Sequence, residues 1–434
     1  MPINRRQFLS STVAGGAALS LGLGQTARAA ASPNNTITMG VMGMSRGLAV
    51  GRAFIERPNC VVKYACDPDS QRAARGAEIL TNESGHTVEA VGDMRRVLDD
   101  PDVDAVILAL PAHWHAPAAI MALQAGKHVY VEKPCCHNPH EGELLVQAAR
   151  EYNKAVQMGN QRRSWPKLQE GIARLHAGEL GRLYYSRSWY SAERGSIGKG
   201  AAAEVPAHLD FDLWQGPAPR VPYKDNLVHY NWHWHWQWGT GELGNNGVHA
   251  LDLCRWGLGV DYPTRVTSSG GRYHFDDDQE TPDTHLVAFD FEDGKSISWE
   301  GLSCVRPTGS GAGFGAAFFG EGGSLVIEGG GFTLYDRAGV EIESVSPDEG
   351  ESTNFPMERE HTENFLAAIR NDTPLSLNSE IAEGYKSTLL PLLGNIAYRT
   401  GRSLNCGANG HILDDTEAQA HWTRDYEPGW EVTV

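Results

Sequence analysis

Cysteine and positive charge are both scarce in this sequence, and each shortage excludes a class of protein. Seven cysteines in 434 residues are an odd number and do not form a disulfide framework. The 37 lysines and arginines are outnumbered by 54 acidic residues, and the formal net charge of −17 argues against a nucleic-acid or anionic-membrane partner. The apolar fraction of 41% is ordinary, and the length suffices for two domains and a large core.

The few cysteines do not point to a metal site either. Cys135 and Cys136 are adjacent and directly follow Pro134. Redox or metal chemistry is one interpretation of this pair, and packing at a turn is the other. We favour packing, because two neighbours in sequence are a poor ligand pair without further cysteines nearby. We therefore predict no metal.

The first 29 residues have the pattern of an export signal. Residues 5–9 (RRQFL) form a twin-arginine signature, and a Gly/Ala-rich apolar run over residues 13–24 follows. That run is too short for a stable spanning helix, and residues 27–29 form a small-x-small cleavage site. We expect residues 1–29 to be a twin-arginine signal peptide and the mature protein to be periplasmic or otherwise exported, without a membrane anchor. Because this route carries folded proteins, it also points to a tightly held cofactor.

The stretch over residues 102–138 predicts strand, loop, helix, strand and turn. Residues 103–108 form a nearly continuous apolar run, as expected for a parallel strand covered on both faces. His113 to His115 are predicted in the loop after this strand, and Glu132 to Pro134 follow the second strand over residues 128–131. Ligands of open parallel sheets bind outside the carboxyl ends of the strands. We interpret this crevice as the active site.

The first strand, residues 36–42, leads into the turn Gly43-Met44-Ser45-Arg46-Gly47 and a helix. This is the place for a dinucleotide fingerprint, whose glycines let the backbone approach a pyrophosphate. The pattern is imperfect, because Ser45 stands where a second glycine is expected and Gly47 comes one position early. A plain strand-to-helix turn is an equally good interpretation of these five residues.

Asp67 ends the next strand, 24 residues after Gly43, and favours the dinucleotide interpretation. An acidic group here accepts hydrogen bonds from ribose hydroxyls and repels a 2′-phosphate. No arginine directly follows Asp67, and Arg72 is the nearest one. We therefore predict NAD rather than NADP.

Residues 230–238 (YNWHWHWQW) are the densest aromatic and histidine stretch. Alternation at period two fits a strand with histidines on one face and tryptophans on the other. Metal binding is a second interpretation, although no carboxylate or cysteine stands close by. The third, which we favour, is a wall of the substrate pocket that includes Trp234 and His235; a purely structural role remains open.

A helix is predicted over residues 248–258, with His249 in its first turn and Asp252 three residues later on the same face. A histidine beside a carboxylate forms an acid/base unit. The alternative is a capping or core histidine, which is the commoner fate of a single histidine.

Glu132-Lys133-Pro134 after AGKHV, following a strand that ends in P-x-x-x-H, resembles the Gfo/Idh/MocA family of nicotinamide-dependent oxidoreductases. The resemblance implies that Lys133 hydrogen-bonds the reacting hydroxyl and that His249 is its acid/base catalyst. The family carries D-x-G-x-H around this histidine, and Asn245 replaces the aspartate here. Residues 159–164 (GNQRRS) resemble the family segment beside the nicotinamide, although Arg162 is equally well explained as a salt-bridge partner.

The expected fold is α/β. We predict a Rossmann dinucleotide-binding domain over residues 33–160 and an α+β domain over residues 161–434 built on a large, mostly antiparallel sheet. Amphipathic helices over residues 361–370 and 383–399 resemble the family's terminal helices, which pack back on the first domain. The exposed face of the large sheet is the family's usual oligomer interface, which implies a homodimer or homotetramer. Alternating residues and Gly-rich turns predict strands of the second domain at residues 183–190, 266–271, 284–291, 296–300, 315–320 and 324–328.

Residues and resemblance together predict hydride transfer between NAD and a carbinol carbon of a sugar, glycoside or cyclitol. Alternatives are an NAD-dependent glycoside hydrolase that oxidises its substrate transiently, a redox cycle between two sugars, and a sugar-binding module without activity. The predicted catalytic residues are Lys133 and His249. The residues assigned to substrate binding are His115, Arg162, Trp234, His235, Asn245 and Asp252. The residues assigned to the cofactor are Gly43, Ser45, Arg46, Gly47, Asp67, Leu110, Pro111, His115, Glu132, Lys133 and Gln161.

Overall fold

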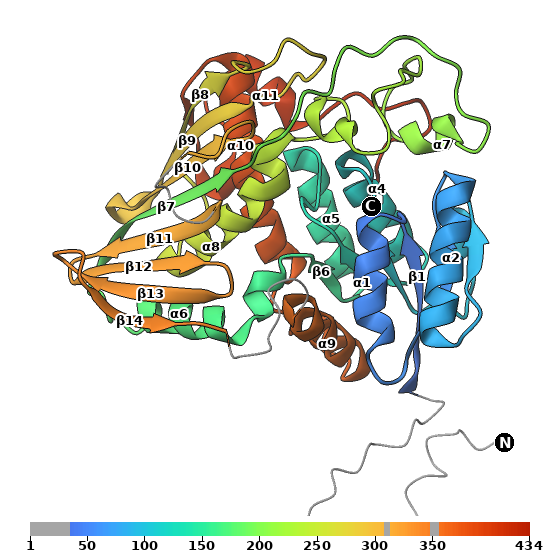
Figure 1. Ribbon diagram of the computed structural model, residues 1–434, viewed down its shortest axis with the longest axis horizontal. Helices are drawn as coiled ribbons and strands as arrows, with labels where there is room; N and C mark the ends of the chain where they lie inside the picture. The colour runs from blue at the N-terminus through green and yellow to red at the C-terminus, as the bar shows by residue number, and fades with distance from the viewer. Residues whose placement is uncertain (1–34, 308–312, 348–355) are drawn as a thin grey trace, which may run out of the picture.

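The structure is a computed structural model that describes residues 35–307, 313–347 and 356–434 (Figure 1). The predicted signal peptide over residues 1–29 lies outside these ranges. The described chain contains two β-sheets, each the centre of one structural unit. No helix within the described ranges is both long and apolar enough to cross a bilayer.

The first unit contains a parallel sheet of six strands in the order β3-β2-β1-β4-β5-β6, which is a Rossmann-type order. The short central strand β4 is buried throughout, as parallel strands covered by helices on both faces are. The strands are β1 (Ile37–Met42), β2 (Cys60–Cys66), β3 (Glu89–Val91), β4 (Ala105–Leu108), β5 (His128–Val131) and β6 (Val156–Met158). The helices that accompany them are α1 (Arg46–Ile55), α2 (Ser70–Ser84), α3 (Arg95–Leu98), α4 (Ala112–Gln124) and α5 (Pro139–Glu151).

Two helix starts decide where side chains of the first unit point. The carboxylate of Asp69 accepts hydrogen bonds from the amides of Gln71 and Arg72 and so caps α2. Helix α4 begins at Ala112, directly after Pro111. The predicted loop over residues 113–115 is therefore wrong, because these residues form the first turn of α4.

The second unit is built on a nine-stranded sheet in the order β14-β13-β12-β11-β7-β10-β9-β8-β15. Every pair is antiparallel except β7 with β10, which confirms the mostly antiparallel sheet. The six predicted strands are present within two residues at each end; β13 to β15 were not predicted. The strands are β7 (Leu183–Ser191), β8 (Arg265–Gly271), β9 (Thr284–Asp290), β10 (Ser296–Leu302), β11 (Phe314–Gly320), β12 (Gly323–Glu328), β13 (Gly331–Asp336), β14 (Glu341–Val345) and β15 (Leu404–Asn405).

Helices join the two units. Helix α8 packs against β7 and β11, whereas α10 packs against β8 of the second unit and also against α5 and β6 of the first. Helix α9 packs against α1, and its His361 carbonyl accepts a hydrogen bond from the buried Gln157 amide at 2.8 Å. The longer helices of this unit are α6 (Pro166–His176), α8 (Val248–Leu258), α9 (Pro356–Arg370) and α10 (Ile381–Thr400).

Residues 194–240, which we call the crossing segment, leave β7 and run over the first unit (Figure 1). Leu209 forms a β-bridge with Asp69, and the Ser70 amide donates to the His208 carbonyl at 2.9 Å. The segment has a small core of its own, which contains Leu209, Phe211, Trp214, Ala218, Tyr223, Leu227 and Trp238. Its only regular elements are short, namely α7 (Phe211–Gln215) and a 3₁₀ turn over Asn231–Trp234. A strand over residues 230–238 is therefore excluded.

Candidate active site

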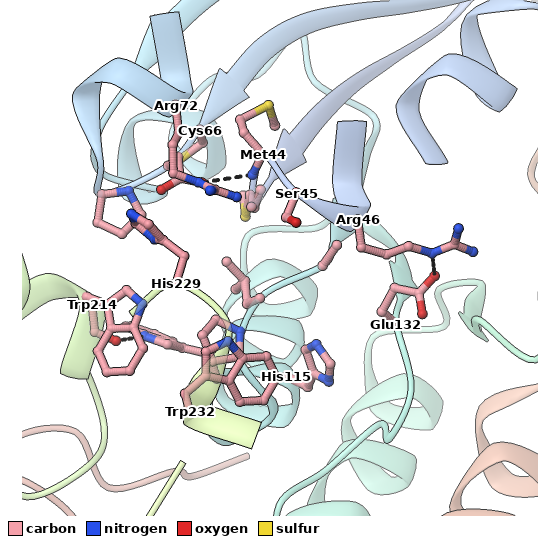
Figure 2. A pocket seen from close by; sticks show the side chains of 18 of the residues that line it. Met44, Ser45, Arg46, Cys66, Arg72, His115, Glu132, Trp214, His229 and Trp232 are labelled. Atoms are coloured by element: carbon pink, nitrogen blue, oxygen red, sulfur yellow. Dashed lines mark hydrogen bonds and ion pairs between the residues drawn. The ribbon is translucent and has the colours of Figure 1, made fainter. Parts of the chain in front are cut away.

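A cavity of about 370 Å³ lies where the carboxyl ends of β1, β2, β4 and β5 face the crossing segment (Figure 2). This is the predicted position for a ligand of an open parallel sheet. Its size is within the range of small-molecule pockets. The predicted residues that line it are Gly43, Ser45, Arg46, Asp67, Leu110, Pro111, His115, Glu132, Lys133, Asn245 and His249.

The turn after β1 brings the backbone close to its neighbours in the way a dinucleotide site requires. Gly43 has a φ of +91°, and a Cβ there would lie 2.3 Å from the Ala109 carbonyl oxygen. Ser45 precedes α1 but its side chain does not cap the helix, so the first amides of α1 point to the N-terminal end without this acceptor. The predicted role of Gly47 needs correction: it is buried against Val41 and Ala109 and does not line the cavity.

Asp67 ends β2 at one end of the cavity and is almost fully buried. Its carboxylate accepts hydrogen bonds from the amides of Met44 at 2.8 Å and Asp69 at 3.0 Å. Arg72 Nε lies 3.4 Å from the same carboxylate. A carboxylate in this place fits ribose hydroxyls. His229 of the crossing segment also lines this end, and sequence reasoning missed it because 160 residues separate it from its partner Asp69.

Glu132 and Arg46 form an ion pair beside the cavity, with Nε and Oε1 separated by 3.0 Å (Figure 2). Burial opposes ionisation of Glu132, but the positive charges of Arg46 and Lys133 outweigh it and hold the pKa of this carboxyl below its usual value. The Gln161 amide donates to Glu132 at 3.2 Å. Gln161 thus holds the Glu132 carboxylate by a hydrogen bond but does not itself line the cavity.

Lys133 follows Glu132 and extends toward the second unit. Its Nζ donates to the Asn245 carbonyl oxygen at 2.8 Å and to the Asn245 Oδ1 at 3.1 Å. Burial lowers the pKa of this ammonium, and Glu132 counteracts part of the shift. Asn245 is held by a π-helical turn over Leu243–Gly247 that runs directly into α8.

His249 lies in the first turn of α8 and lines the same cavity as Lys133. Its Nδ1 has no hydrogen-bond partner in the described part of the chain. Burial, followed by the charges of Lys133 and Arg162, lowers the pKa of His249 well below its usual value, so the imidazole is neutral at pH 7. A neutral imidazole is able to accept a proton from a substrate hydroxyl.

Asp252 is not the carboxylate partner of His249, and its assignment to substrate binding needs correction. Both its oxygens bind Arg163 Nε, at 2.9 and 3.0 Å, and Oδ1 also accepts from Ser387 Oγ at 2.6 Å. It is buried away from the cavity. The spacing of three residues was the only sequence signal, and Arg163, 89 residues away, decides where this side chain points.

His115 is placed by the first turn of α4. Its Nδ1 donates to the Pro134 carbonyl at 2.6 Å, while Nε2 is buried without a partner among the described residues. Burial lowers the pKa of this imidazole to about 4. His115 is therefore a neutral group whose position is fixed by the turn that follows Lys133.

Three further predicted substrate residues lie outside the cavity. The guanidinium of Arg162 packs over the Phe314 ring, with 4.1 Å between carbon and ring centroid. Trp234 packs under Arg194, and His235 pairs with Glu280 at 3.7 Å.

The wall that was predicted at Trp234 and His235 is formed instead by Trp232 and His233, whose rings stack at 3.6 Å. A 3₁₀ turn, unlike a strand, does not sort residues onto two faces by alternation. The period-two pattern therefore identified the right segment but the wrong residues.

The parallel sheet, the glycine turn and the carboxylate at the end of β2 define a protein of the dinucleotide-binding class. Residues 37–160 match the family described as "Oxidoreductase family, NAD-binding Rossmann fold". Residues 188–432 match the family's second domain, described as "Oxidoreductase family, C-terminal alpha/beta domain". The chain belongs to the Gfo/Idh/MocA oxidoreductase family.

Two relatives carry different activities in their names. A glycosyl hydrolase family 109 protein of Saccharopolyspora erythraea is 26% identical in an alignment of 212 positions that covers 44% of this chain and 46% of that protein. A levoglucosan dehydrogenase of Pseudarthrobacter phenanthrenivorans is 28% identical in an alignment of 188 positions that covers 39% of this chain and 47% of that protein. The matched segments span just under half the length of each relative.

Solved structures share the fold over a greater length. A levoglucosan dehydrogenase in complex with NADH and levoglucosan gives a TM-score of 0.67 at 19% identity, covering 85% of this chain and 99% of the other. An aldose-aldose oxidoreductase from Caulobacter crescentus, complexed with glycerol, gives a TM-score of 0.64 at 17% identity, with coverage of 85% and 99%. These two likenesses confirm the predicted combination of a Rossmann unit with a large-sheet unit.

Proposed function

We propose that this protein is an NAD-dependent oxidoreductase that transfers a hydride between nicotinamide and a carbinol carbon of a sugar, glycoside or cyclitol. One observation carries the proposal: Lys133 and His249, which come from different units, line the same cavity as the glycine turn and Asp67. The name of the levoglucosan dehydrogenase relative is consistent with this substrate class.

Each side chain has a separate task in this proposal. Bound NAD supplies the acceptor for the hydride that leaves the carbinol carbon. Lys133 donates a hydrogen bond to the reacting hydroxyl oxygen, and His249, neutral at pH 7, takes up the hydroxyl proton. The alcohol thereby becomes a carbonyl, and one hydride and one proton leave it. Trp232 offers an aromatic face to the sugar ring.

The first experiment asks what the purified, folded protein holds and oxidises. Small molecules are released by heat and identified by mass spectrometry, and absorbance of reduced nicotinamide is recorded after levoglucosan, scyllo-inositol or aryl glycosides are added. Bound or bindable NAD and a substrate-dependent rise in absorbance are expected. Absence of bound NAD and of affinity for added NAD contradicts the proposal.

A second function, redox-neutral glycoside cleavage with transient oxidation, is favoured by the crossing segment. Because Leu209 and His229 of this segment bind the start of α2, the segment borders the cavity at the end beside Asp67. A cofactor held between the two units in this way is suited to being oxidised and reduced in place. Release of aglycone from an aryl glycoside without net NADH formation distinguishes this function from the dehydrogenase.

We further propose that residues 1–29 direct export by the twin-arginine route and that the mature protein forms a homodimer or homotetramer. The sequence pattern supports the first proposal. Leu286 on β9, which is 46% exposed, supports an interface on the outer face of the large sheet. Cell fractionation after Arg5→Lys and Arg6→Lys substitution tests export, and sedimentation of a Leu286→Glu variant tests assembly.

A further inference from the structure

Asn245 lies between a half-buried cation, Lys133, and a buried anion, Glu242. On one side Lys133 Nζ donates to the Asn245 Oδ1 at 3.1 Å. On the other side the Asn245 Nδ2 donates to Glu242 Oε1 at 3.4 Å. Glu242 is 3% exposed, so its charge is not dispersed by solvent.

These two neighbours determine which way the Asn245 amide faces. An ammonium only donates hydrogen bonds, and a carboxylate only accepts them. The amide therefore has one orientation that satisfies both, with Oδ1 toward Lys133 and Nδ2 toward Glu242. In the reversed orientation the Asn245 Nδ2 donor would face the Lys133 ammonium, and the Oδ1 acceptor would face the Glu242 carboxylate.

Glu242 is itself held firmly. Arg194 Nε donates to its Oε2 at 2.6 Å, and the Asn246 side-chain amide donates to Oε1. The guanidinium of Arg194 also contacts the hydroxyls of Tyr190 and Tyr230, at 3.3 and 2.9 Å. The carboxylate thus has a fixed position three residues before Asn245, at the start of the π-helical turn.

This arrangement explains why residue 245 is an asparagine where the family pattern has an aspartate. A carboxylate at position 245 would stand about as close to Glu242 as the amide does now, and two like charges at that distance do not both ionise readily. With Glu242 present, the neutral amide transmits the hydrogen bond and leaves a single negative charge near Lys133.

We propose that Glu242 is the positioning residue of the active site, acting through Asn245 to hold Lys133 in place and to supply the negative charge that an aspartate at position 245 would otherwise carry. The inference rests on the proposed function for the identity of Lys133 as the group that touches substrate. Glu242 itself does not touch the substrate.

The charges around Lys133 determine in which direction its pKa should move when the Glu242 charge is removed. Acidic groups that face it are Glu132 from the end of β5 and Glu242. Cationic groups are Arg46 from α1 and Arg162. The histidines that interact with it electrostatically are His115, His233 and His249. Burial lowers the pKa of Lys133, whereas Glu132 and Glu242 raise it, so loss of the Glu242 charge lowers the pKa further.

Competitive labelling measures the pKa of Lys133 without any substrate. Full-length protein as purified is treated with trace acetic anhydride between about pH 7 and pH 11, a range that spans the ordinary lysine pKa. Mass spectrometry then quantifies acetylation of the peptide that contains Lys133. In Glu242→Gln we expect the midpoint of labelling to fall by about one pH unit. An unchanged midpoint overturns the inference.

Arg194→Gln is the matched control, because it breaks the same ion pair from the other side and leaves the Glu242 charge in place. We expect the Lys133 midpoint to stay or rise in this variant, since a cation has been removed. An equal fall in Glu242→Gln and Arg194→Gln would mean that the pair only supports the fold, and would overturn the inference.

The double variant Glu242→Gln/Asn245→Asp moves the carboxylate to the family position. We expect it to regain the wild-type labelling midpoint, and to regain turnover of whichever panel sugar the wild type oxidises. Should Glu242→Gln fail to fold, the double variant still decides the matter, because its labelling midpoint should equal that of the wild type. A Lys133 midpoint that differs from the wild-type value in the folded double variant overturns the inference. If the wild type oxidises no sugar, the proposed function fails while the labelling result stands.

Discussion

At the scale of single residues, the proposed chemistry depends most on Lys133. Its Nζ reaches Asn245 across the cavity, and Lys133→Ala removes the donor to the reacting hydroxyl. We expect kcat/KM to fall by about 10²- to 10⁴-fold. Bound NAD should be retained, and the thermal midpoint should stay close to that of the wild type because the side chain is only half-buried. Steady-state kinetics and calorimetry measure these effects.

Lys199→Ala serves as the control for that variant. The Lys199 side chain is 61% exposed and pairs with Asp276 on the surface. Its loss should leave both turnover and stability within error of the wild type. Wild-type turnover in Lys133→Ala would contradict the assignment of Lys133 as a catalytic residue.

Buried neutral histidines predict how stability depends on pH. Burial lowers the pKa of His115 and of His361 to about 4. In the unfolded chain these groups titrate near their ordinary value of about 6.5. Between those pH values the unfolded state binds more protons, so the free energy of unfolding falls as the pH decreases from about 6.5 toward about 4, by about 1.4 kcal/mol per pH unit for each such histidine.

Urea titrations at several pH values within this window test that slope. His115→Asn should reduce the slope by about one histidine's share, because asparagine binds no proton in either state. A slope identical in the wild type and in His115→Asn contradicts the expected pKa shift.

Sequence reasoning located the residues of the cavity better than it located their partners. Lys133, His249, Asp67 and Asn245 follow local patterns, such as a strand end or a helix start, and the structure brings them to one cavity. The partner of Asp252 could not be found in this way, since Arg163 is distant in sequence and only packing of α8 brings it near.

At the scale of elements, the turn between β1 and α1 makes the strongest prediction. Gly43→Ala places a methyl carbon 2.3 Å from the Ala109 carbonyl oxygen in a backbone with positive φ. We expect the turn to shift, NAD binding to weaken by at least about tenfold, and the free energy of unfolding to fall by about 1–3 kcal/mol. Calorimetric titration with NAD and thermal denaturation measure both quantities.

Gly85→Ala separates strain from crowding. Gly85 also has positive φ, at +73°, but no atom lies within 4 Å of a Cβ built there. This variant should lose about 1 kcal/mol from backbone strain alone and bind NAD normally. Equal effects of the two substitutions would show that the close approach at Gly43 is unimportant.

Some elements could be predicted from local sequence patterns and others could not. Strands β1, β4 and β5 are apolar runs with glycine or proline near their ends, and they were predicted. The predicted loop over residues 113–115 is wrong because Pro111 directly precedes a helix, as proline often does, and does not begin a loop. The period-two pattern over residues 230–238 does not indicate the course of the crossing segment, because contacts with α2 and with the segment's own small core determine that course.

At the scale of the whole molecule, the crossing segment joins the second unit to the end of the cavity beside Asp67. His229 Nε2 lies 2.9 Å from the Asp69 carboxylate there. We expect His229→Ala to release bound NAD about tenfold faster, because a hydrogen bond to a charged group contributes about 1.5 kcal/mol. Nucleotide remaining after repeated desalting is the readout.

His208→Ala is the companion variant. Its Nε2 lies 3.5 Å from the same carboxylate, so its loss should change the release rate less. Release as slow in His229→Ala as in the wild type would mean that the crossing segment does not hold the nucleotide.

A nucleotide kept beneath the crossing segment would have to be regenerated where it lies. The molecule that reduces it and the molecule that reoxidises it would then meet the same Lys133 and His249, one after the other. Double-reciprocal plots of initial rate against the concentration of one substrate, at several fixed concentrations of the other, should give parallel lines. At high concentration each substrate should inhibit competitively against the other. In that regime the oxidant would be a second carbohydrate rather than free dinucleotide, and the surroundings would have to supply both sugars but no NAD.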